Sequence, residues 1–303
     1  MTGPLRMGTR RSLMATTQSG LVAARFTELT GRAVETVGVT TYGDVTRANL
    51  TQLGGTGVFV SALRDKLIEG EIDFAVHSLK DLPTTPDPRV VIAAIPPRDD
   101  CRDALVAGGK LADLPPGARI GTGSPRRIAQ LRMLRPDIEC VPIRGNGETR
   151  IGKVTSGELH GVVLAAAGLV RLGREAEIAQ IFEVEEMLPA PGQGALAVEV
   201  RSDRADLIEL LGVLDDPVTR AAVTAERTVL NALEAGCAAP VGAFAAVDGQ
   251  DLNLTAAVVA IDGGTAVRKS TAGTSSAAVD LGRDLAAQMI AEGAGTLMGE
   301  QTH

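Results

Sequence analysis

Tryptophan is absent from this sequence of 303 residues, and aromatic residues make up only 2% of it. Any core must therefore be built from aliphatic side chains, and the 45% of hydrophobic residues are enough to form one. The chain is long enough for two or three domains. Cysteine is also scarce. Cys101, Cys140 and Cys237 are an odd number without metal-ligand spacing, which argues against a disulfide framework and against a bound metal such as zinc.

Long apolar segments are missing as well. No run of 18 apolar residues occurs, and the first residues lack the apolar core of a signal peptide. The net charge of -7 at pH 7 argues against a nucleic-acid binder or an anionic-membrane binder. We therefore expect a cytoplasmic protein that has neither a membrane nor a nucleic acid among its partners.

Short apolar runs bounded by glycine, proline and polar residues predict an α/β protein. Strands are expected at residues 5–9, 35–40, 74–76, 90–95, 104–107, 118–122, 138–143, 161–166 and 195–200. A helix should start after the N-cap Ser12 and end at Gly31, and a second should cover residues 59–68. Residues 42–57 are polar and rich in glycine, which predicts a long loop of the kind that can cover a site.

Two proline-rich breaks, at residues 96–100 and 187–194, bracket the middle of the chain. An inserted domain joined by a double hinge would give this pattern, with the strand at 195–200 returning to the first domain. We therefore predict three domains: residues 1–95 with 195–212, residues 101–188, and residues 217–303.

The last of these domains is expected to be of the α+β type. Asp216 should cap a helix that begins at Pro217 and ends at Gly236. Strands are predicted at 241–247 and 252–258, and a final helix at 277–292. The apolar stripe of the first helix consists of Val218, Ala222, Ala225, Val229 and Leu233.

A polar turn follows the strand at 74–76 and contains Ser78, Lys80 and Asp81 before Pro83. Lys80 stands out because only five of the 30 basic residues are lysines. Open α/β sheets present their sites at such strand ends, although a solvated turn without chemistry is the alternative.

Arginines occupy positions that helix electrostatics disfavours. Arg10 and Arg11 precede the helix capped by Ser12, and Arg126 and Arg127 fall in the first turn of a helix that Ser124 should cap. Positive charge at a helix N-terminus costs about 0.3–1 kcal/mol per charge. An anionic ligand would relieve this cost, and salt bridges to nearby acids are the alternative.

Further arginines, Arg144 and Arg171, follow other predicted strands. Arginines from separate strand ends would converge on one crevice that suits a polycarboxylate or a phosphate. Neither a Walker loop nor a Gly-x-Gly-x-x-Gly sequence lies at a strand–helix junction, so carboxylates are favoured over nucleotides.

The short match between residues 6–9 and residues 119–122 also fits two similarly built α/β domains.

Cys237 lies between a predicted helix end and a predicted strand. A thiol in such a loop can be exposed and reactive, whereas a lone cysteine is more often buried and inert. His77 is the only histidine near a motif, so Cys–His hydrolase chemistry has little support.

Together these motifs resemble the porphobilinogen deaminase family, also called hydroxymethylbilane synthases. The resemblance runs along essentially the whole chain. It rests on Gly8-Thr-Arg-Arg-Ser12, Ala75-Val-His-Ser-Leu-Lys-Asp-Leu-Pro83, Gly121-Thr-Gly-Ser-Pro-Arg-Arg127, Arg144-Gly-Asn146, Ala167-Gly-Leu-Val-Arg-Leu-Gly173, Pro191-Gly-Gln-Gly-Ala195 and Gly236-Cys237.

The resemblance implies two lobes like those of a periplasmic ligand-binding protein, joined by a double hinge, and a small α+β C-terminal domain. It also implies a dipyrromethane cofactor, made from two porphobilinogen units and linked to Cys237 by a thioether. Four porphobilinogen molecules would be deaminated and added to this primer, and hydrolysis would release hydroxymethylbilane. We expect a monomer whose partners are porphobilinogen and the growing oligopyrrole chain.

Residue roles follow from the same motifs. Asp81 would be the catalytic carboxylate. The residues implied to hold the cofactor, besides Cys237, are Ser78, Lys80, Thr122, Ser124, Arg126 and Arg127. The residues implied to bind the substrate or the elongating chain are Arg10, Arg11, Ser12, Gln18, Phe59, Arg144, Asn146, Arg150, Arg171 and Gln193.

The sequence departs from several relatives at three positions: Thr17 replaces an aromatic residue, Thr56 replaces a lysine in the loop at 42–57, and Gly123 replaces a serine. The alternative function is a non-catalytic, two-lobed protein that binds carboxylates or other anions. Such a protein needs the arginines but neither Asp81 nor Cys237. An effector domain of a transcriptional regulator is a third reading, but no helix-turn-helix segment precedes the first predicted strand.

Overall fold

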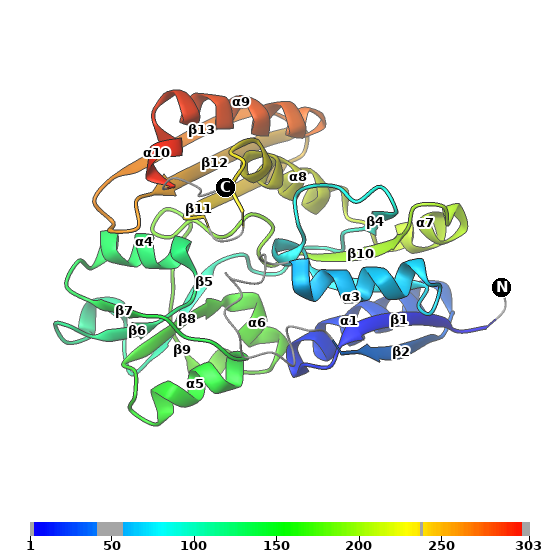
Figure 1. The fold of residues 1–303 in the computed structure, drawn as a ribbon, viewed down its shortest axis with the longest axis horizontal. Coiled ribbons are helices and arrows are strands. Elements are labelled where there is room, and N and C mark those ends of the chain that lie inside the picture. Colours follow the sequence, from blue (N-terminus) through cyan, green and yellow to red (C-terminus); the bar gives the residue numbers. More distant parts are fainter. Residues whose placement is uncertain (1–2, 41–56, 237–238, 299–303) are drawn as a thin grey trace. The chain divides into compact units, whose positions relative to one another are not determined.

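The computed structural model describes residues 3–40, 57–236 and 239–298, with the backbone alone at 57–59. The chain falls into two compact units, Met1–Arg98 with Ala195–Arg220 and Asp99–Gly194 with Ala221–His303 (Figure 1). Both units are of α/β type, which confirms the predicted fold class. The boundaries of the three predicted domains stay a prediction. No helix within the described ranges is long and apolar enough to cross a membrane.

The first unit is built on a five-stranded mixed sheet with the order β2-β1-β3-β10-β4. β1 runs parallel to β2 and β3, whereas β10, the strand after the second proline-rich break, runs antiparallel to β3 and β4. The strands are β1 (Leu5–Arg10), β2 (Val34–Val39), β3 (Phe74–Ser78), β4 (Val90–Ala94) and β10 (Leu196–Arg201). The helices are α1 (Leu13–Thr30), α3 (Gly57–Ile68) and α7 (Ala205–Leu211).

Both faces of this sheet are covered. Phe26 of α1 packs on Phe74 of β3, with ring centroids 6.4 Å apart, in a core that is otherwise aliphatic. Ala75, the next residue of β3, faces the other way and packs with Leu63 and Leu67 of α3. Successive strand residues point to opposite faces, so α1 and α3 cover opposite sides of the sheet.

The second unit contains a sheet of the same design, with the order β7-β6-β8-β5-β9. β6 runs parallel to β7 and β8, and β5 runs antiparallel to β8 and β9. The strands are β5 (Asp103–Ala107), β6 (Arg119–Gly121), β7 (Glu139–Val141), β8 (Gly161–Ala165) and β9 (Ile178–Ile181). The helices are α4 (Pro125–Leu134), α5 (Gly147–Thr155) and α6 (Ala166–Arg171).

The short repeat in the sequence occupies the same place in each sheet. Residues 6–9 lie on β1 and residues 119–122 lie on β6 and just after it, and both strands are second in their sheet order. A Cβ on Gly8 would lie 2.3 Å from Ile72 Cδ1, and one on Gly121 would lie 2.6 Å from Leu159 Cδ1. At both glycines an added methyl group would therefore force a packed neighbouring side chain to shift.

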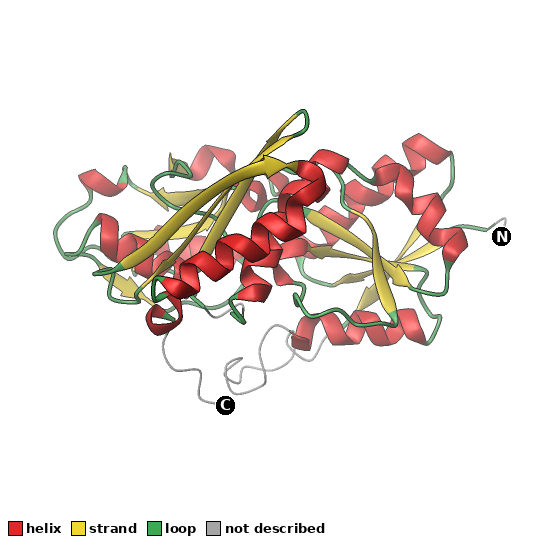
Figure 2. Ribbon diagram, turned by 90° about the horizontal axis from the view of Figure 1, so that it is seen from above, coloured by secondary structure: helices red, strands yellow, loops and turns green. Residues whose placement is uncertain are grey.

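The second unit also holds a three-stranded antiparallel sheet, and α9 lies along this sheet (Figures 1 and 2). A small core between α4 and β12 contains Ala129, Leu188 and Ala257, which joins this sheet to α4. The elements are α8 (Pro217–Ala232), which belongs to this unit from Ala221 onward, β11 (Val241–Asp248), β12 (Asp251–Val259), β13 (Ala266–Thr274), α9 (Ala278–Ala291) and α10 (Ala294–Leu297). Short 3-10 turns occur at Leu79–Asp81, Leu111–Asp113, Glu175–Glu177, Gly212–Leu214 and Ser275–Ala277.

Some sequence predictions were wrong or incomplete. Gly236 does not end α8, which stops at Ala232; the left-handed residue is Glu234, with φ of 52°. Val218 is 49% exposed rather than buried with the rest of its stripe, because it lies in the first turn of α8.

The sequence reading missed β9 and β13. The loop expected at 42–57 lies outside the described residues except for Gly57, which begins α3.

Candidate active site

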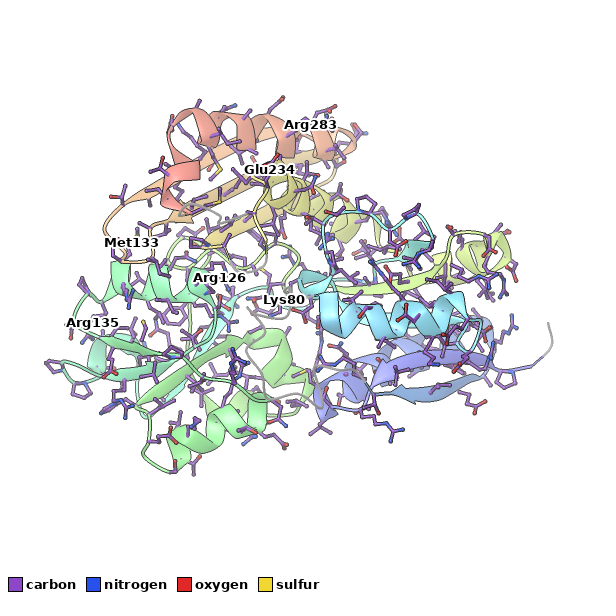
Figure 3. All side chains as sticks on the ribbon, in the orientation of Figure 1. Lys80, Arg126, Met133, Arg135, Glu234 and Arg283 are labelled. Atoms are coloured by element: carbon purple, nitrogen blue, oxygen red, sulfur yellow. The ribbon has the colours of Figure 1, made fainter. Side chains whose placement is uncertain are left out.

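The turn after β3 is held by its apolar residues. Leu79 and Leu82 are fully buried, and the Leu79 amide donates to the Ala195 carbonyl at 3.0 Å. A 3-10 turn then covers Leu79–Asp81 and contains Lys80, which is labelled in Figure 3. In this turn Lys80 is partly buried and Asp81 is exposed. The turn therefore has a fixed base and presents the Asp81 carboxylate at the surface of the first unit.

Two other predicted site residues meet beside this turn. Ser78 Oγ donates to Gln18 Oε1 at 3.1 Å, and Gln18 is buried in α1. The contact joins the start of the turn to the helix that Ser12 caps. Arg10 is partly buried and Arg11 exposed before that helix, whose N-cap accepts from the Ala15 amide as predicted.

In the second unit, one carboxylate holds two buried guanidinium groups. Asp103 Oδ2 accepts from Arg126 Nη1 at 2.7 Å, and Oδ1 accepts from Arg127 Nη2 at 2.7 Å. Gln193 Nε2 also donates to Asp103 Oδ1, at 2.8 Å. All four side chains are buried, and Arg126 lies at the start of α4 (Figure 3).

The charges in this cluster do not cancel. Burial alone would raise the pKa of Asp103, but Arg126 and Arg127 hold it well below its usual range, so the carboxyl is ionised. Burial also lowers the pKa of Arg126. Two guanidinium groups against one carboxylate leave one positive charge in a poorly solvated place. Arg126 Nε is buried and has no hydrogen-bond partner among the described residues.

The structure therefore revises the argument from helix electrostatics. The first turn of α4 does carry two arginines behind the Ser124 cap, but Asp103 relieves their charge in part, as the salt-bridge alternative requires. The surplus positive charge and the unpaired Nε still fit an anionic cofactor. Sequence reasoning missed Asp103. The sequence signal that could have identified it is an aspartate at the first position of the buried strand β5, because a buried charge needs a partner.

Thr122 and Ser124 complete the junction between β6 and α4. Thr122 is fully buried, and its Oγ1 accepts from the Ser124 amide at 3.2 Å. Ser124 Oγ in turn accepts from the Arg127 amide at 3.4 Å. Both hydroxyls lie at the helix N-terminus, next to the arginine cluster, where the dipole favours negative charge.

Arg171 lies at the end of α6 and is bound to two separate parts of the chain. Its Nε donates to Asp99 Oδ2 at 2.8 Å, and its Nη2 donates to the Gly194 carbonyl at 2.7 Å. Gly194 has φ of +86°, and a Cβ there would lie 2.5 Å from the Asp99 carbonyl oxygen. Arg171 thus ties together the two chain crossings at the proline-rich breaks.

The residues after β7 form a group of their own. Asn146 Oδ1 caps α5 by accepting from the Thr149 amide at 2.8 Å, and Arg150 Nε donates to the Gly145 carbonyl at 2.9 Å. Arg144 is exposed at the start of this turn.

Two predicted site residues, Cys237 and Phe59, have side chains outside the described part of the structure. Cys237 lies outside the described residues, and Phe59 belongs to α3 with only its backbone described. Just before Cys237, Glu234 has a left-handed backbone that usually favours glycine (Figure 3). The Ala235 amide donates to the Leu230 carbonyl at 3.1 Å and closes the end of α8.

Comparisons with known proteins bear on these motifs directly. A family model described as "Porphobilinogen deaminase, dipyromethane cofactor binding domain" matches residues 5–209, and the model of the family's C-terminal domain matches residues 220–291. This chain belongs to the porphobilinogen deaminase family. Porphobilinogen deaminase of Thermobifida fusca is 59% identical, over 99% of this chain and 97% of that protein. Porphobilinogen deaminase 1 of Streptomyces coelicolor is 59% identical, over 98% of each chain.

Solved structures of periplasmic binding proteins are more distant. A periplasmic substrate-binding protein of an ABC transporter from Coxiella burnetii matches with a TM-score of 0.44 and 13% identity, over 72% of this chain and 94% of that chain. The methionine-binding protein MetQ matches with a TM-score of 0.45 and 11% identity, over 69% and 89%. These matches are too weak to carry an argument about function.

Proposed function

We propose that this member of the porphobilinogen deaminase family deaminates four porphobilinogen molecules, joins them head to tail, and releases hydroxymethylbilane by hydrolysis. The product is a precursor in tetrapyrrole biosynthesis. The dipyrromethane cofactor, bound to Cys237 through a thioether, supplies the free pyrrole carbon to which new rings are joined. The proposal includes a monomeric, cytoplasmic enzyme, as the sequence predicts.

The observation that carries the proposal is the buried Asp103–Arg126–Arg127 cluster with its surplus positive charge. Each pyrrole ring of the cofactor bears an acetate and a propionate, so these groups would offset that charge. Thr122, Ser124 and Lys80 add donors to the set of cofactor-binding residues. Arg10, Arg11, Ser12, Gln18, Phe59, Arg144, Asn146, Arg150, Arg171 and Gln193 remain the residues proposed for the substrate and the growing chain.

Asp81 is the residue that an enzyme needs and that a protein which only binds anions does not. When the amino group of the aminomethyl substituent of porphobilinogen leaves as ammonia, the methylene carbon stays on the ring and the substrate becomes an azafulvenium cation. A carboxylate beside the pyrrole N–H stabilises that cation, and the same group can accept the proton that is lost when the new carbon–carbon bond forms. Asp81 is exposed on a turn whose base is buried, which suits this task.

A turnover assay tests the function. Purified chain supplied with porphobilinogen should release four molecules of ammonia for each hydroxymethylbilane formed. An anion-binding protein without catalysis would retain porphobilinogen and release no ammonia, and that result would refute the proposal.

A further inference from the structure

Two buried side chains and one partly buried side chain, from three elements of the first unit, meet on one face of its sheet. Glu199 of β10 accepts from Arg64 of α3, with Nη2 at 2.7 Å from Oε1 and Nε at 3.1 Å from Oε2. His77 of β3 places Nε2 at 3.4 Å from Glu199 Oε2. The side chains of Glu199, His77 and Arg64 are 2%, 6% and 14% exposed.

The strand register explains why these groups meet. Ala75 pairs with Glu199 and His77 pairs with Ala197, so Glu199 and His77 share the face that α3 covers. The pairing of β10 with β4 shifts register between Val198 and Glu199. Such irregularities re-aim a side chain and are common beside active sites.

Stability alone does not account for this cluster. A buried ion pair has a desolvation cost, and well-packed apolar residues of similar volume are often as stable or more so. Burial alone would raise the pKa of Glu199, but contacts with His77 and Arg64 lower it below its ordinary value, which keeps the carboxylate ionised. A buried charge held in this way specifies one arrangement of the elements that carry it.

Both strands joined by the cluster lead to the candidate active site. His77 directly precedes Ser78 and the turn that presents Asp81. β10 starts just after Ala195, whose carbonyl accepts from the amide of Leu79 in that turn. Glu199 thus connects β3 and β10, the two strands that hold the turn. Arg64 of α3 fixes the Glu199 carboxylate through its hydrogen bonds.

We propose that Glu199 is a positioning residue of the reaction, acting through His77 and clamped by Arg64, that fixes the end of β3 and hence Asp81. The inference rests on the proposed function, since Asp81 is the group whose position matters. A displacement of about 1 Å at a reacting group can lower a rate about a hundredfold.

The central test is Glu199→Gln, which keeps the shape of the side chain and removes its charge. In the holoenzyme we expect kcat to fall about tenfold or more, with KM for porphobilinogen within about twofold of the wild type. Amide hydrogen exchange at Leu79 should become faster in the same variant. If Glu199→Gln folds poorly, Arg64→Met gives a second test, because it removes the guanidinium group and should produce the same fall in kcat.

Asp73→Asn is the matched control. Asp73 directly precedes β3 at its other end, and its Oδ1 accepts from Arg6 Nη2 at 3.0 Å. This variant should lower the Tm but leave kcat and Leu79 exchange within about twofold of the wild type. Equal effects of Glu199→Gln and Asp73→Asn on kcat, or a Glu199→Gln enzyme with kcat and Leu79 exchange like the wild type, would overturn the inference.

The activity of the wild-type holoenzyme distinguishes a failure of this inference from a failure of the proposed function on which it rests. If the wild type forms no hydroxymethylbilane, the proposed function fails, whatever the variants do. Faster exchange at Leu79 in Glu199→Gln would then still support the anchoring of the turn. If the wild type is active and Glu199→Gln matches it in rate and in exchange, only the positioning role fails.

Discussion

Arg127 donates two hydrogen bonds to a single oxygen of Asp103, from Nε at 3.0 Å and from Nη2 at 2.7 Å. The other carboxylate oxygen is bonded to Arg126. Asp103 is therefore the residue that makes a pair of adjacent buried arginines tolerable. The cluster also retains a positive charge, which links the stability of the second unit to its affinity for an anion.

Removal of the Asp103 carboxylate should lower the free energy of unfolding. Asp103→Ala leaves two buried guanidinium groups without their counterion, so we expect the free energy of unfolding to fall by about 3–5 kcal/mol. Urea denaturation measures this change. Glu183→Ala is the control, because Glu183 is 59% exposed in its pair with Arg102 and should contribute less than about 1 kcal/mol. Similar losses in the two variants would show that burial of the cluster does not matter.

The same residue should give a distinctive pH dependence. The pKa of Asp103 is depressed in the folded protein, so its contribution to stability is present above the unfolded pKa of about 3.9. That contribution is lost as the pH falls through the lower folded pKa. We expect wild-type stability to decline more steeply below about pH 5 than that of Asp103→Ala. Parallel curves for the two proteins would contradict this assignment.

Loss of Asp81 should affect chemistry and not folding. Asp81→Ala removes an exposed carboxylate, so the Tm should stay within about 2 °C of the wild type, while kcat falls about 10²–10⁴-fold. A tetrapyrrole assay and thermal unfolding measure the two effects. Glu28→Ala is a suitable control, since Glu28 is a 69% exposed acid on α1 in the same unit. Near-normal turnover in Asp81→Ala would refute the catalytic role.

The two equivalent glycines should prove sensitive to one added methyl group. Gly8→Ala and Gly121→Ala would each force a Cβ into a packed side chain, and we expect a loss of about 1–3 kcal/mol in each. Gly20→Ala is the control, because no atom lies within 4 Å of its added Cβ and the residue sits inside α1. That substitution should stabilise the protein by about 0.5–1 kcal/mol. A stabilised Gly8→Ala variant would show that the close approach to Ile72 is relaxed easily.

Local rules in the sequence predicted much of this fold. Ser12, Gly31 and Ser124 act as the caps that their residue types suggest, and the strands up to β8 are found within a few residues of the predicted positions. The pairing of β10 with the first sheet followed from the two proline-rich breaks. The caps and strands depend on short-range chemistry, which a single sequence displays.

Features that depend on tertiary contacts were missed. β13 alternates between exposed and partly buried residues such as Arg268 and Lys269, so it has little apolar pattern to detect. Glu234 adopts a backbone that its residue type does not suggest, because the end of α8 is fixed by the Schellman-type bond to Leu230. Asp103 and Glu199 each sit in a buried strand, and their partners lie more than 20 residues away in sequence. Such pairs cannot be identified from one sequence by spacing.

The intact mass of the purified protein, produced in cells that supply porphobilinogen, tests the central claim most directly. We predict an increase over the polypeptide mass equal to two porphobilinogen molecules less two of ammonia, with the adduct mapped to Cys237. Cys237→Ser should lack this increase, and Arg127→Leu should reduce the adduct-bearing fraction. A wild-type protein with the bare polypeptide mass, or an adduct on another residue, would contradict a covalent dipyrromethane primer at Cys237.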